Sequence, residues 1–73
     1  MDQKKIIENE MREVKSDIDE TMNEIERTTF KLNHEKLDDK DKRYIALKLK
    51  ELNKELKSLN KHLKDLNAEY AKL

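Results

Sequence analysis

Most large apolar residues of the chain, together with two threonines, fall into two series with helical spacing. Both series advance by alternating intervals of four and three residues, which places their members along one face of an α-helix as a heptad seam. The first series is Ile7, Met11, Val14, Ile18, Thr21, Ile25, Thr28 and Leu32. The second is Ile45, Leu49, Leu52, Leu56, Leu59, Leu63, Leu66, Tyr70 and Leu73. We therefore predict two amphipathic helices, of which the second has the more apolar seam.

The two seams are out of phase with each other. Continuing the first seam beyond Leu32 would place Glu35, Asp39 and Lys42 at seam positions. Three successive charged positions favour a turn, although a three-residue stammer would allow one continuous helix. Asp38 and Asp39 are candidate N-caps for a second helix, and Asp41 adds an acidic group to its first turn.

The predicted organisation is a single domain over residues 1–73. Its helices cover about 3–33 and about 39–72, and the turn covers about 34–38. One long helix remains the alternative, because the chain has no glycine to make a tight turn.

An antiparallel hairpin brings the two seams together in register. If facing residues have numbers that add to 77, every layer joins an a position to a d position, as antiparallel helices require. The layers are Leu32–Ile45, Thr28–Leu49, Ile25–Leu52, Thr21–Leu56, Ile18–Leu59, Val14–Leu63, Met11–Leu66 and Ile7–Tyr70. The g positions would then place Glu10 opposite Glu69 and Glu24 opposite Glu55.

Composition suggests that this hairpin associates with another copy. Only 34% of the residues are hydrophobic, whereas ordering a chain costs about 1.5 kcal/mol per residue. The predicted fold is therefore an all-α, antiparallel two-helix hairpin of coiled-coil type that pairs into a four-helix bundle, most simply as a homodimer. The candidate contact is a set of uncharged residues, all at e positions beside the seam: Met22, Thr29, Ala46, Asn53 and Asn60.

Charge is abundant but balanced, with 17 basic and 17 acidic residues. Along the second helix, the b and f positions form a lysine stripe: Lys40, Arg43, Lys50, Lys54, Lys57, Lys61 and Lys64. Along the first helix, the g and c positions form an acidic row: Glu10, Glu13, Asp17, Glu20 and Glu24. These surfaces are open to three interpretations, namely solvated faces, phosphate binding by the stripe, or contact between stripe and acidic row in different molecules.

Four large apolar residues lie off the seams near the predicted turn. This turn tip consists of Phe30, Leu37, Tyr44 and Leu47. The residues either wrap the turn and cap the core, or form an exposed surface that binds a partner.

The sequence offers little basis for catalysis. Cysteine and glycine are absent, which excludes thiolate sites and glycine-rich phosphate loops, and His34 and His62 are isolated imidazoles. We expect no enzyme activity, no catalytic residues, no cofactor, no metal and no small-molecule substrate. We also expect no membrane segment, because the longest apolar run is residues 44–47. The expected location is cytoplasmic.

Three functional hypotheses follow from the sequence. The first is a small helical interaction protein, acting as an oligomeric adaptor, assembly factor or regulator through protein–protein binding. The second is a nucleic-acid-binding hairpin that uses the lysine stripe, although arginine is scarce and aromatic residues are not interleaved with the lysines. The third is a coiled-coil spacer or arm of a larger assembly.

Overall fold

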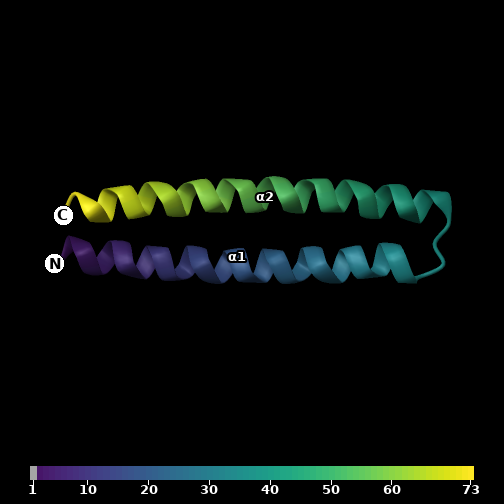
Figure 1. Cartoon of the computed structure of the whole chain (residues 1–73), viewed down its shortest axis with the longest axis horizontal. Helices are drawn as coiled ribbons and strands as arrows, with labels where there is room; N and C mark the ends of the chain where they lie inside the picture. Colours follow the sequence, from purple (N-terminus) through teal and green to yellow (C-terminus); the bar gives the residue numbers. More distant parts are fainter. Residues whose placement is uncertain (1) are drawn as a thin grey trace.

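The chain forms an antiparallel hairpin of two long helices, α1 (Gln3–His34) and α2 (Asp39–Ala71) (Figure 1). The computed structural model describes residues 2–73. The two helices lie side by side along their whole length, so that the chain ends meet at one end of the rod and the turn forms the other. The hairpin prediction is confirmed, and the alternative of one continuous helix is wrong.

Both helices begin at an aspartate cap. The Asp2 side chain accepts a hydrogen bond from the Lys4 backbone N–H at 3.0 Å. The Asp38 carboxylate accepts one from the Asp41 N–H at 2.8 Å. These bonds satisfy backbone donors that have no partner within the helix. Asp39 and Asp41 add negative charge to the first turn of α2, where the helix dipole favours it.

The turn is made without glycine because its caps keep an extended backbone. Glu35 ends α1 with φ −99° and ψ 146°, and Asp38 precedes α2 with φ −76° and ψ 171°. No residue among 2–73 has a positive φ, so the left-handed conformation that favours glycine is not used. The absence of glycine, which argued for one long helix, is therefore compatible with the turn.

The core is the predicted seam. Every residue of the eight predicted layers is buried or half-buried. The most enclosed residues are Val14, Ile18, Thr21, Thr28, Ile45, Leu52 and Leu66. Leu73 lies outside this core and is 47% exposed, because α2 ends at Ala71. The hydrophobic core is thus a single file of side chains between two helices.

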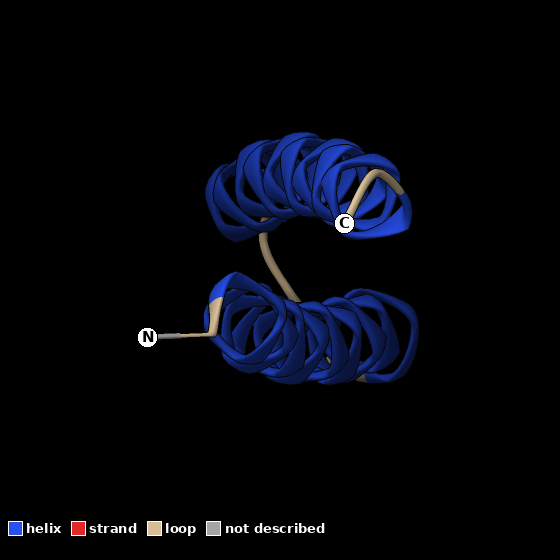
Figure 2. Cartoon of the chain, turned by 90° about the vertical axis from the view of Figure 1, so that its left-hand side faces the viewer, coloured by secondary structure: helices blue, strands red, loops and turns tan. Residues whose placement is uncertain are grey.

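The rod is narrow and open on all sides. Its principal extents are 54, 15 and 14 Å. Viewed end on, the described part of the chain shows the two helices alone, with no third element over either broad face (Figure 2). Each helix therefore leaves most of its circumference available for contact with solvent or another molecule.

Candidate interaction surfaces

The lysine stripe is an exposed surface on α2 that Leu47 interrupts between Arg43 and Lys50. All seven of its cations are exposed. Within residues 2–73 none of them has a carboxylate within 4.0 Å, since the ion pair found there joins Lys48 to Glu24. Lys54, Lys57, Lys61 and Lys64 also line a shallow hollow on the back of α2 together with Ser58 and Asn60. The fold leaves this surface without an intramolecular partner.

The acidic row occupies a different face, on α1. Four of its five carboxylates are exposed, and Glu24 is half-buried. The predicted register places Glu24 opposite Glu55. In the structure, the Glu24 carboxylate lies 3.6 Å from the Lys48 Nζ. Lys48 has a long flexible side chain that reaches along the groove, so it relieves the expected like-charge contact. Because both side chains are more than 40% exposed, the pair contributes little to stability.

The turn tip does not form one patch. Phe30 lies on the outer face of α1 and stacks on His34 with ring centroids 4.0 Å apart. The Nδ1 of His34 is 3.0 Å from the carbonyl oxygen of Phe30, which holds the imidazole against the ring. Leu47 lies at the corresponding f position of α2, on the opposite outer face. Phe30, Tyr44 and Leu47 are 61%, 70% and 63% exposed, so these three do not cap the core.

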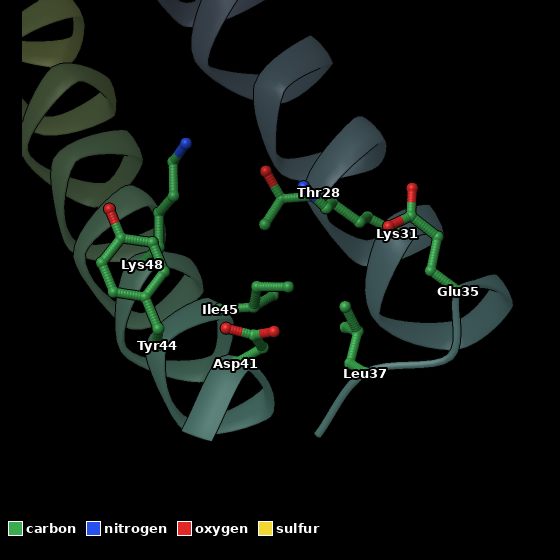
Figure 3. Close-up of a pocket in the computed structure, with 8 residues that line it drawn as sticks. All are labelled: Thr28, Lys31, Glu35, Leu37, Asp41, Tyr44, Ile45 and Lys48. Atoms are coloured by element: carbon green, nitrogen blue, oxygen red, sulfur yellow. The ribbon is translucent and has the colours of Figure 1, made fainter. Parts of the chain in front are cut away.

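A cleft of about 370 Å³ lies where the turn meets the two helices (Figure 3). Its apolar part includes Leu37 from the turn and Ile45 from α2, and Figure 3 shows both side chains directed into the space between the helices. Tyr44 lies at the α2 edge. The remaining lining residues are polar or charged: Thr28, Lys31, Glu35, Asp41 and Lys48. Of the turn tip, Leu37 alone is half-buried, and it covers the end of the core.

The candidate self-association surface over the e positions, termed the e side, is open. Met22 is 52% exposed, and Ala46, Asn53 and Asn60 are exposed as well. Thr29 is half-buried at the edge of the seam. The Asn53 side-chain amide donates a hydrogen bond to the Leu49 carbonyl at 3.0 Å, so its N–H donor is partly satisfied within α2. The e side therefore presents an uncharged strip beside the core.

A polar contact that was not predicted from the sequence joins the two helices near the chain termini. The Tyr70 hydroxyl donates a hydrogen bond to the Glu8 carboxylate at 2.8 Å, and the Lys4 Nζ lies 6.0 Å from the Tyr70 ring centroid. This bond, and the negative charge of Glu8, raise the pKa of Tyr70 because both oppose formation of the phenolate. The signal was present in the sequence, since Tyr70 faces Ile7 in the predicted layers and Glu8 is the next residue.

The described residues hold no candidate metal site. Among residues 2–73, no three histidine, aspartate or glutamate side chains are grouped to hold a metal ion. Neither helix has an apolar stretch long enough to cross a bilayer. No protein-family model matches the chain, and comparisons with curated proteins and with solved structures find no match. Function must therefore be argued from the exposed surfaces of the hairpin.

Proposed function

We propose that the chain is a non-enzymatic helical interaction protein, an oligomeric adaptor, assembly factor or regulator that acts by binding another protein. The observation that supports this most directly is the exposure of Phe30, Tyr44 and Leu47 in the half of the rod near the turn. Nearly every other large apolar residue of this half serves the seam. These side chains do not form one patch, so we propose each of them as a separate anchor for a partner.

The turn tip is expected to be dispensable for folding and required for binding. Replacing Phe30 and Leu47 together by alanine should leave the melting temperature nearly unchanged, because both side chains are more than 60% exposed. The same double variant should lose the protein that the immobilised hairpin captures from a lysate of its source cells. Capture is measured with and without nuclease, so that bridging by nucleic acid is removed.

A matched control is available at the other end of the rod. Ile6 and Leu73 are both 47% exposed, and their double alanine variant should retain capture. A large fall in melting temperature for the Phe30 and Leu47 variant would assign these residues to folding instead. Unchanged capture by that variant would contradict the proposed binding role.

Self-association through the e side forms the second part of the proposal. The core is one file of side chains, in which no residue of 2–73 is less than 2% exposed. Small cores of this kind commonly gain stability by oligomerisation. Two hairpins that pair through their e sides would form a four-helix bundle in which Met22 and Ala46 become buried. We propose a homodimer of this form.

Charge introduced on the e side is expected to dissociate this dimer. Met22→Glu with Ala46→Glu would place carboxylates inside the contact, where their desolvation is unfavourable. Sedimentation equilibrium in about 1 M salt, where the Debye length is about 3 Å, should show a dimer for the unmodified chain and a monomer for this variant.

The neighbouring f positions provide the control for charge alone. Asn23→Glu with Leu47→Glu adds the same charge one residue further along each helix, turned away from the e side. This control should remain dimeric. A monomeric unmodified chain that is fully helical at micromolar concentration would rule out the dimer.

A further inference from the structure

We propose that the lysine stripe of one hairpin docks on the acidic row of a second copy, with the two helices antiparallel. This contact uses the outer face of α2 and the g and c positions of α1, and it does not involve the e side. It therefore goes beyond the proposed dimer. The partner is identified by the charge pattern that the chain itself carries.

The lysine stripe and the acidic row have the same residue spacing. The last five cations of the stripe advance by intervals of 4, 3, 4 and 3 residues from Lys50 to Lys64. Read backwards from Glu24 to Glu10, the acidic row has the same intervals. Antiparallel alignment gives five opposite-charge pairs whose residue numbers all add to 74: Lys50–Glu24, Lys54–Glu20, Lys57–Asp17, Lys61–Glu13 and Lys64–Glu10.

This geometry is the same as that of the hairpin's own seam. There the rows of α1 and α2 also advance by four and three residues in opposite directions, and the structure packs the two helices against each other along the rod. Each charge row spans 14 residue intervals, or about 21 Å at the helical rise of about 1.5 Å. Two straight helices can therefore keep all five pairs within reach of flexible side chains.

The chain beyond the charge rows fits the same alignment at one end. Ile6, which is 47% exposed, would face Ala68, and Gln3 would face Ala71. Toward the turn, the alignment no longer pairs opposite charges, because Lys31 would face Arg43. The contact is thus bounded: it covers residues 3–24 of α1 in one copy and 50–71 of α2 in the other, and it leaves out the part of the rod nearest the turn.

The groups in the contact are available for an intermolecular pair. The five stripe cations have no intramolecular ion pair within residues 2–73. Of the acidic row, Glu24 does contact Lys48 at 3.6 Å, so Lys50 of the second copy would share this carboxylate. Because the pairs remain near solvent, the association should weaken as salt is added.

A second copy fits the stripe better than a nucleic acid does. The formal net charge of the chain is zero, and the acidic row lies along the same rod as the stripe, where it would repel a polyanion. The stripe contains one arginine, Arg43, and no aromatic residue. Pairing between copies explains why the stripe and the acidic row have the same residue intervals. Phosphate binding by the stripe does not explain the intervals of the acidic row.

The docking surfaces on one copy are different from each other, which determines the form of the assembly. A contact between unlike surfaces continues from copy to copy unless its rotation closes a ring. Species larger than a dimer should therefore form at low salt. In about 1 M salt they should revert to the e-side dimer, whose contact is uncharged, so failure of one association is distinguishable from failure of the other.

Charge exchange between two variants tests the proposal. A stripe variant carries Lys54→Glu, Lys57→Glu and Lys61→Glu, and a row variant carries Glu13→Lys, Asp17→Lys and Glu20→Lys. Each variant alone should lose the larger species in sedimentation velocity at about 10 mM salt. An equimolar mixture should recover them, because each reversed surface then meets its complement on the other variant.

The control reverses three exposed lysines outside the stripe, with Lys5→Glu, Lys36→Glu and Lys42→Glu, and should retain the larger species. Circular dichroism confirms that each variant remains helical. The absence of larger species in the unmodified chain, their persistence in either variant alone, or no recovery in the mixture would overturn the proposal. Their loss on nuclease treatment would also overturn it and assign the stripe to nucleic acid.

Discussion

Replacing Leu66 by alanine is expected to lower the free energy of unfolding by about 2–3 kcal/mol. Leu66 is 4% exposed, which makes it the most enclosed hydrophobic residue, and it packs with Val14 and Ile18 in the main cluster of the core. Truncation removes its apolar burial and leaves a cavity that two helices close only partly. Because the core is one file of side chains, this loss is a large part of the total stability.

The measurement is urea denaturation followed by far-ultraviolet circular dichroism at fixed protein concentration, since any dimer makes stability depend on concentration. Leu73→Ala is the matched control, because Leu73 belongs to the same sequence series yet is 47% exposed beyond the end of α2. It should change the free energy of unfolding by less than about 0.5 kcal/mol. Equal effects at the two positions would contradict the observed core.

Replacing Thr28 by valine is expected to raise the free energy of unfolding by about 1 kcal/mol. Thr28 is 9% exposed and occupies a seam position that an apolar residue fills in most other layers. Valine keeps the branched shape and removes the polar group. Thr21, at 6% exposed, should respond in the same way, and the two effects should nearly add because two turns of helix separate them.

Thr28→Ser separates the two halves of the threonine side chain. Serine retains the hydroxyl and loses the buried methyl group, so stability should fall by about 1 kcal/mol. Thermal and urea denaturation of both variants give the signs of the effects. A valine variant less stable than the unmodified chain would show that the hydroxyl has a favourable partner in the folded state.

The residues of the seam could be predicted from the sequence because their spacing is periodic. Intervals of four and three residues fix which side of a helix is apolar, and two such series of similar length can face each other in few ways. Leu52 and Val14 are therefore buried as expected. The position of the turn was also predictable, since Asp38 is followed by acidic residues that favour a helix start.

Contacts made by long or flexible side chains could not be predicted in the same way. Glu24 pairs with Lys48, although helix geometry alone placed Glu55 opposite it. Phe30 and Leu47 were grouped because both lie near the turn along the sequence, yet their f positions place them on opposite outer faces of the hairpin. Nearness along the chain does not establish a shared surface when two helices run in opposite directions.

Residue spacing alone was enough to predict that the chain is helical, which residues form the seam, and how charge is distributed along each helix. These properties follow from local spacing, which repeats at every turn of an α-helix. The tertiary structure confirmed the predicted hairpin and showed in addition that Tyr70 bonds Glu8 and that most of the turn tip remains in solvent. These features depend on residues far apart in sequence, because the packing of α1 against α2 determines which side chains are covered and which remain exposed.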